Sequence, residues 1–111
     1  CDTVEIYEAP IDAMSGATLR QYKHDSPWRS VHYLALGGLN HQPIDYFLQR
    51  HPEVKRVSLC FDRDDPGRNF TKIAAKRLAE RGYIIQDTPP AIGKDYNDYL
   101  LAARRLISME R

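Results

Sequence analysis

The chain has 111 residues, of which 42% are hydrophobic and 28% are charged. This length suits one domain with a single core, and the composition is that of an ordinary globule rather than a disordered tail. The apolar runs are only a few residues long, which excludes a membrane-spanning helix. The net charge of +1 gives the whole chain no attraction to nucleic acid, so such binding would need a local basic patch or another domain.

The pattern of apolar residues predicts strands that alternate with helices. Strands are expected at residues 3–7, 31–36, 56–61 and 83–86. Helices are expected from Pro10 to about Lys23 with Ile11, Met14, Thr18 and Tyr22 at helical spacing, from Pro43, along Phe70, Ile73, Ala74 and Leu78 up to Gly82, and from about Tyr96. This alternation predicts an α/β fold: a four-stranded, mostly parallel sheet with helices on both faces.

The two cysteines show no metal-ligand spacing, and Cys60 is expected to be a buried residue of a central strand. A reducing cytoplasm fits this usage best. The chain is expected to be a single domain over residues 1–111. Because it starts at Cys1, directly before a strand, we expect it to be a fragment of a longer protein.

Acidic residues gather on three loops of the predicted fold. They are Glu8 and Asp12, Asp62 and Asp64, and Asp95. The first two groups follow predicted strands, and the carboxyl ends of parallel strands meet at one edge of a sheet, where ligands bind. Clustered carboxylates repel one another unless they hold protons or a cation. Oxygen ligands suit Mg²⁺ or Mn²⁺, so the sequence predicts a divalent-metal site there.

Each loop also has a simpler interpretation. Asp62 and Asp64 could belong to a polar turn, and Glu8 and Asp12 could be carboxylates that favour a helix start. Asp65 is expected to cap the next helix or the turn formed by residues 65–67 rather than to bind metal. The GKDYND segment could be only a turn and a helix start. If it is instead part of the metal site, Asn97 and Asp98 are its accessory residues.

Basic residues flank the acidic loops and are candidates for contacts with phosphate groups. They are Arg63, Arg68, Lys72 and Lys94. A solvated helix face is the alternative role for such residues. The four histidines, at positions 24, 32, 41 and 51, show no ligand spacing and are assigned no role.

With these residues placed, the chain resembles a Toprim domain, the module shared by bacterial primases, type IA and type II topoisomerases, and certain nucleases and recombination proteins. The resemblance runs from about Val4 to Leu100. The family's acidic positions are matched by Glu8, by Asp12 as in primase-type members, and by Asp62 and Asp64. GKDYNDYL most resembles Toprim-like domains of primase-related proteins from phages, plasmids and mobile elements. Ala9 stands where the family usually has glycine.

The resemblance implies a Rossmann-like Toprim fold and nucleotidyl or phosphoryl transfer on DNA or RNA with Mg²⁺ or Mn²⁺. Glu8, Asp62 and Asp64 would be the catalytic residues and metal ligands. The first hypothesis is the catalytic domain of a DNA primase-like protein, and the near alternative is a metal-dependent nuclease. A non-catalytic module that binds nucleic acid or a partner is the hypothesis from another class. A nucleotide is a further candidate ligand, and no membrane partner is expected.

Overall fold

The computed structural model describes residues 2–23, 31–91 and 93–110, with side chains at 2–19, 31–91 and 93–105. Strands and helices alternate along this part of the chain. They are β1 (Thr3–Tyr7), α1 (Pro10–Lys23), β2 (His32–Ala35), α2 (Gln42–Arg50), β3 (Arg56–Cys60), α3 (Asp65–Glu80), β4 (Ile84–Asp87) and α4 (Tyr96–Glu110). The predicted elements are confirmed, although β2 is shorter than expected and β4 begins one residue later.

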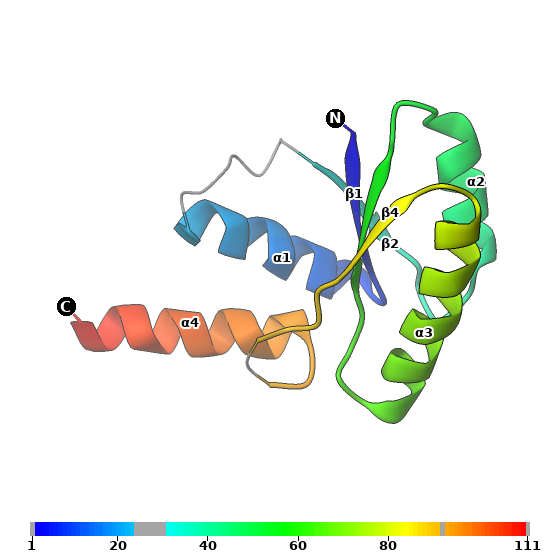
Figure 1. Ribbon diagram of the computed structural model, residues 1–111. Coiled ribbons are helices and arrows are strands. Elements are labelled where there is room, and N and C mark those ends of the chain that lie inside the picture. The colour runs from blue at the N-terminus through cyan, green and yellow to red at the C-terminus, as the bar shows by residue number, and fades with distance from the viewer. Residues whose placement is uncertain (1, 24–30, 92, 111) are drawn as a thin grey trace.

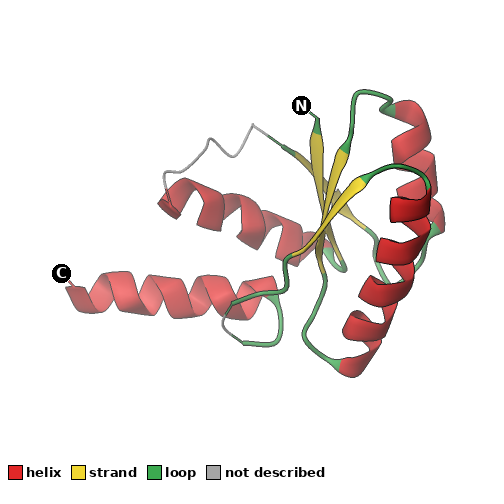
Figure 2. Cartoon of the chain, in the orientation of Figure 1, coloured by secondary structure: helices red, strands yellow, loops and turns green. Residues whose placement is uncertain are grey.

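The strands form one sheet in the order β2-β1-β3-β4, and each neighbouring pair is parallel. Helices α1 and α4 cover one face of the sheet, and α2 and α3 cover the other (Figures 1 and 2). This is the predicted Rossmann-like α/β fold, with a fully parallel sheet. Within the described residues, no helix is both long and apolar enough to cross a membrane.

The central strands β1 and β3 are buried on both faces, as expected for a parallel sheet covered by helices. One apolar cluster joins the sheet to α2 and α3 and includes Val4, Ile6, Ile44, Leu48, Val57, Leu59, Phe61, Phe70, Ala74 and Leu78. A second cluster, on the side of α1 and α4, contains Tyr7, Leu19, Cys60, Tyr96 and Leu100. The core therefore consists of two layers separated by the sheet, and the prediction that Cys60 is buried is confirmed.

Helix α1 does not bury the side that its apolar spacing predicted. Ile11 and Met14 are 56% and 71% exposed, whereas Asp12 and Ser15 are buried. A Cβ atom at Gly16 would collide with the Tyr7 ring, so glycine lets α1 lie close to β1. The apolar stripe proposed for this helix was therefore wrong at its first two positions. The side chain of Tyr22, which belonged to that stripe, lies outside the described residues.

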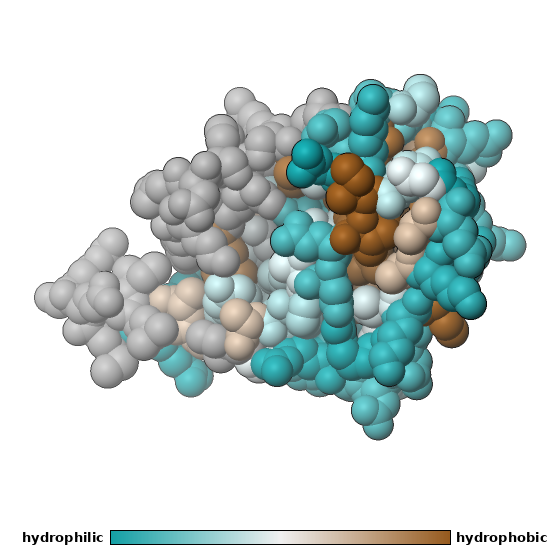
Figure 3. Space-filling view, in the orientation of Figure 1, coloured by the Kyte–Doolittle hydropathy of each residue, from teal (hydrophilic) through white to brown (hydrophobic). Residues whose placement is uncertain are grey.

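In the described part of the chain, one edge of the sheet is formed by β4, which pairs with β3 alone. Ile84 on this strand is 58% exposed. Figure 3 shows an apolar area around β4, framed by hydrophilic surface. Ile73 of α3, which was predicted to be part of a buried stripe, is also exposed. The buried face of α3 is narrower than the sequence pattern suggested and consists mainly of Phe70, Ala74 and Leu78.

Candidate metal centre at the carboxyl ends of the strands

The strand order places the two main acidic loops side by side. Tyr7 at the end of β1 pairs with Cys60 at the end of β3, and Glu8 and Asp62 follow these residues closely. From these central strands the chain leaves toward opposite faces of the sheet, because α1 and α3 lie on different faces (Figure 1). Such a point, where the direction of winding reverses, is where open α/β sheets bind ligands. The predicted meeting of Glu8 and Asp62 at this edge is therefore confirmed.

The pKa of Glu8 is strongly perturbed at this edge. Its pKa is raised from 4.5 to about 7 by burial, by a hydrogen bond with Asp62, and by repulsion from Asp62, Asp64 and Asp12. Its Oε2 atom is buried and has no hydrogen-bond partner among the described residues. Because a buried polar atom without a partner is costly, this oxygen is suited to a ligand that the protein itself does not provide.

Asp62 shares the electrostatic environment of Glu8. Burial raises the pKa of Asp62, and repulsion from Asp64 and Asp95 raises it further. The hydrogen bond with Glu8 and the charge of Lys94 act in the opposite direction on this pKa. Burial and repulsion thus act against ionisation of both carboxyl groups at once, and their hydrogen bond raises the pKa of Glu8 while it lowers that of Asp62.

Asp12 of α1 connects this helix with α4. Its side chain is only 4% exposed, and its Oδ1 atom accepts a hydrogen bond of 3.3 Å from the backbone N–H of Asn97 in α4. The Asn97 side chain in turn accepts a hydrogen bond of 3.5 Å from Ser15 of α1. Burial raises the pKa of Asp12 to about 6 despite the Asn97 hydrogen bond, and repulsion from Asp95 and Asp62 contributes. Asp12 therefore belongs to the acidic cluster and also orders the start of α4.

Asp64 begins helix α3. Its Oδ1 atom accepts a hydrogen bond of 2.9 Å from the backbone N–H of Gly67, as an N-cap residue does. A side chain at Gly67 would collide with the backbone carbonyl oxygen of Asp62. Glycine at this position therefore lets the start of α3 pack closely against the loop of residues 62–64. The prediction that Asp65 is the cap was wrong. Residues 65–67 form the first turn of α3, and the cap is one residue earlier.

The loop before α4 brings its acidic and basic side chains to the same edge. Asp95 accepts a hydrogen bond of 2.8 Å from the N–H of Asp98, and Asp98 accepts one of 3.2 Å from the N–H of Lys94. The N–H of Arg63 donates to the backbone carbonyl of Lys94 at 2.8 Å, which connects this loop with the loop after β3. Asp95 thus starts α4 and stays close enough to raise the pKa values of Asp12 and Asp62.

The four predicted phosphate contacts have different environments. The Arg68 guanidinium makes two 3.0 Å hydrogen bonds to Asp87 of β4 and further bonds to backbone carbonyls, so its donors are engaged within the protein. The Lys94 ammonium is exposed and lies 3.6 Å from Asp64 Oδ2. Arg63 and Lys72 are exposed. The Lys94 ammonium therefore lies beside a carboxylate of the acidic edge, whereas the Arg68 guanidinium contacts that edge through a backbone carbonyl.

The acidic residues fit a hard divalent cation. All five offer oxygen ligands, as Mg²⁺ and Mn²⁺ require, and the partnerless Oε2 atom of Glu8 provides an unused acceptor. Among the described residues, the ligand atoms of His32, His51 and Glu53 all lie within 4.8 Å of one another. The carboxyl groups of the acidic edge are more widely spread than these atoms. A cation at the acidic edge would therefore use few of these carboxylates directly and keep water ligands, as Mg²⁺ commonly does.

Sequence reasoning missed the group of His32, His51 and Glu53. His32 and Glu53 are separated by 21 positions, and they meet only because β2 and the segment after α2 lie at the same end of the sheet. Only the short spacing between His51 and Glu53 was visible in the sequence. That spacing is too common to indicate a site by itself.

Comparison with known protein families places residues 5–100 in the family described as Toprim-like. This match covers most of the chain and contains all five acidic residues of the predicted site. No curated protein matches the chain.

Proposed function

Because the chain belongs to the Toprim-like family, whose members bind divalent metal ions and act on nucleic acid, we propose that it transfers nucleotidyl or phosphoryl groups on DNA or RNA. More specifically, we propose that it is the catalytic domain of a DNA primase-like protein of a mobile element, working in the cytoplasm. The observation that carries this proposal is the placement of Glu8 beside Asp62 at the ends of the two central strands, where burial and nearby carboxylates raise the pKa of Glu8.

Glu8, Asp62 and Asp64 would hold Mg²⁺ or Mn²⁺ in this proposal, with Asp12 and Asp95 adding negative charge around them. The bound ion would neutralise charge on phosphate oxygens and orient the reacting groups. With its pKa at about 7, Glu8 can also accept or donate a proton near neutral pH, as a general acid–base does. The exposed Lys94 ammonium beside Asp64 is the best-placed cation for a phosphate of a nucleotide or a nucleic-acid strand.

The first test is metal binding, followed by thermal unfolding of the protein with Mg²⁺ or Mn²⁺. A ligand that binds only the folded state raises the melting temperature. The test variant is Asp62→Asn/Asp64→Asn, because asparagine at position 64 keeps an oxygen for the Gly67 N–H and so preserves the start of α3. Asp65→Asn, an exposed acid in the first turn of α3 beside that loop, is the matched control. The proposal requires stabilisation of the wild type and the control, and none of the double variant.

The second test separates the possible reactions. Primer synthesis on a single-stranded template, lost in Asp62→Asn/Asp64→Asn, would support the primase-like function. Metal-dependent cleavage of DNA without added nucleotides would assign a nuclease instead, with water as the nucleophile. Nucleic-acid binding that persists in the double variant and in the presence of a chelator, with neither reaction detected, would show a binding module and refute catalysis.

A further inference from the structure

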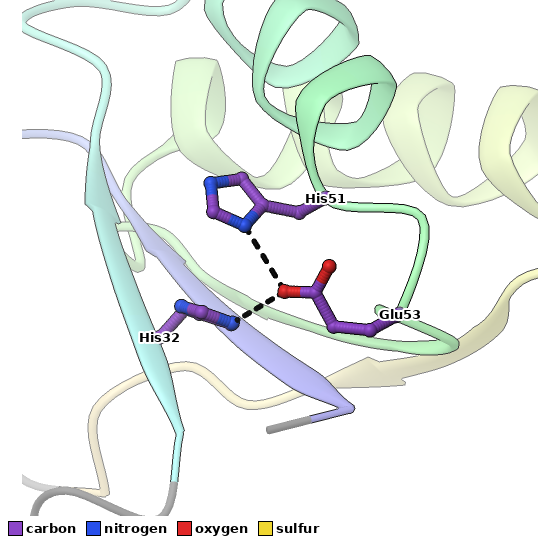
Figure 4. A group of neighbouring side chains, drawn as sticks. All are labelled: His32, His51 and Glu53. Carbon is purple, nitrogen blue, oxygen red and sulfur yellow. Dashed lines mark hydrogen bonds and ion pairs between the residues drawn. The ribbon is translucent and has the colours of Figure 1, made fainter.

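His32, His51 and Glu53 form a compact group at the other end of the sheet from the acidic loops. His32 is the first residue of β2, His51 follows α2, and Glu53 lies in the segment that leads to β3 (Figure 4). The register pairs His32 with Val4, near the beginning of β1, whereas Glu8 follows the end of that strand. The group therefore lies at the amino ends of the strands, and the acidic site lies at their carboxyl ends.

The two imidazoles face the same carboxylate oxygen. His32 Nε2 lies 3.2 Å from Glu53 Oε2, and His51 Nδ1 lies 3.0 Å from the same atom. A tetrahedral zinc ion with bonds of about 2.0–2.1 Å holds its ligand atoms about 3.3–3.4 Å apart. The two nitrogen–oxygen distances are close to this separation, and all three ligand atoms lie within 4.8 Å of one another. Only small movements of these side chains would be needed to surround an ion.

Aromatic packing orients both imidazole rings. The ring of His51 stacks on Phe47 of α2, with 4.2 Å between ring centroids and 22° between ring planes. The ring of His32 meets the same phenylalanine edge to face, with centroids 5.5 Å apart. The backbone of His51 is also held, because its N–H donates to Leu48 and its carbonyl accepts from Val54. Ligands that are oriented in advance lose less freedom when an ion binds.

The type of ligand distinguishes this group from the acidic site. Two imidazole nitrogens and one carboxylate oxygen are the ligands of transition metals such as zinc, and they suit magnesium poorly. The three side chains are 27%, 36% and 47% exposed, in the order His32, His51 and Glu53, so water can reach the ion and fill the remaining position. The exposure also gives an ion a path into the site.

We propose that His32, His51 and Glu53 bind a Zn²⁺ ion that fixes the edge strand β2 to the segment between α2 and β3. Among the described residues β2 pairs with β1 alone, so no described strand lies along its outer side. A zinc ion bound by ligands from β2 and from the segment after α2 adds a connection at this edge. Its role is to stabilise the fold, and it does not depend on the reaction at the acidic site.

The test is a Zn²⁺ titration of the whole chain in competition with a coloured chelator, together with thermal unfolding in Zn²⁺. We expect one bound ion and a higher melting temperature. Glu53→Gln removes one ligand from an exposed position, and the affinity should fall at least ~100-fold, because loss of an outer-shell partner already costs 10–100-fold. His32→Gln is a second variant with the same expected loss. Glu80→Gln, an exposed carboxylate at the end of α3, is the control and should bind as the wild type does.

The acidic-site variant Asp62→Asn/Asp64→Asn makes the outcome unambiguous. It should bind Zn²⁺ with unchanged affinity, because its substitutions lie at the opposite ends of the strands. The proposal is overturned if the wild type binds no zinc, or if Glu53→Gln and His32→Gln bind as tightly as the wild type. It is also overturned if zinc binding is lost only in the acidic-site variant, because the ion would then occupy the carboxylate edge.

Discussion

Replacing Glu8 with glutamine should stabilise the protein at pH 8 when no metal is added. The folded state raises the pKa of Glu8 from 4.5 to about 7, so it binds the proton more tightly than the unfolded chain does. The free energy of unfolding therefore falls as the pH rises from about 4.5 to about 7, and the full loss of stability is present above pH 7. Glutamine carries no charge at any pH and can still donate a hydrogen bond to Asp62.

The size of this effect follows from the pKa. A change from 4.5 to about 7 corresponds to about 3 kcal/mol, at 1.36 kcal/mol per pKa unit. Partial contact with water weakens the underlying interactions, so we expect about 1–2 kcal/mol. Urea unfolding of the wild type and Glu8→Gln at pH 8 and pH 5, in the presence of a chelator, measures it. The gain should be present at pH 8 and mostly gone at pH 5, where the wild-type carboxyl group is protonated in the folded state.

Glu80→Gln is the control for this experiment, because Glu80 is an exposed glutamate at the end of α3. It should change stability little and equally at the two pH values. The reasoning about the acidic edge would be refuted if Glu8→Gln were less stable than the wild type at pH 8. A gain of equal size at both pH values would also refute it, because the effect would then not come from the charge of Glu8.

Three further substitutions test contacts around the site by urea unfolding. Tyr96→Phe removes a hydroxyl that donates to a backbone carbonyl at 2.7 Å and should cost about 1 kcal/mol. Gly67→Ala forces a methyl group against the carbonyl of Asp62, so it should cost about 1–3 kcal/mol and weaken Mn²⁺ binding. Arg68→Ala removes both hydrogen bonds to Asp87 and should cost about 1–2 kcal/mol.

Each of these variants has a neighbour for comparison. Tyr83→Phe is the control for the tyrosine, Asn69→Ala for the glycine, and Lys72→Ala for the arginine. Asn69 and Lys72 are exposed, and Tyr83→Phe keeps the ring that packs against the core. Each control should therefore stay within about 0.5 kcal/mol of the wild type. If a test variant matched its control, the corresponding contact would contribute nothing to stability.

The sheet and the position of the acidic loops were predictable because both depend on short-range patterns. Apolar runs such as residues 56–61 predict buried strands, and the turns between them leave few possible topologies. Once the sheet is parallel, any acid directly after a central strand must lie at its carboxyl edge. Glu8 and Asp62 were placed correctly by this argument, without any knowledge of distances.

The buried face of α1 was not predictable from the spacing of its apolar residues. Ile11 and Met14 have the periodicity of a buried stripe, but the helix turns Asp12 and Ser15 inward to the acidic edge and to α4. Hydrogen bonds between α1 and α4 determine which side of α1 faces inward. The spacing of apolar residues along the helix carries no information about these bonds. Polar contacts thus shift the buried side of α1 away from Ile11 and Met14, while Leu19 of the same helix still packs in the core.

Two further features were not predicted from the sequence: which aspartate caps α3, and the group formed by His32, His51 and Glu53. Asp64 and Asp65 are adjacent and chemically alike, and only the backbone geometry of the loop decides that Asp64 accepts from Gly67. His32 and Glu53 come together through the packing of β2 against the segment after α2. The choice between two adjacent aspartates as the cap depends on local backbone geometry, and the meeting of His32 with Glu53 depends on the fold. The spacing of apolar residues in the sequence indicates neither of them.

The acidic edge destabilises the metal-free fold near neutral pH. Glu8 and Asp12 have pKa values of about 7 and 6, so near neutral pH the metal-free site retains part of its protons. A divalent cation favours the ionised carboxylates and must displace these protons, so its affinity should rise with pH between about 6 and 8. The two apolar clusters of the core do not depend on these acids, and an apolar edge would hold the sheet with less repulsion. Their close placement is therefore better explained by ligand binding than by the needs of folding.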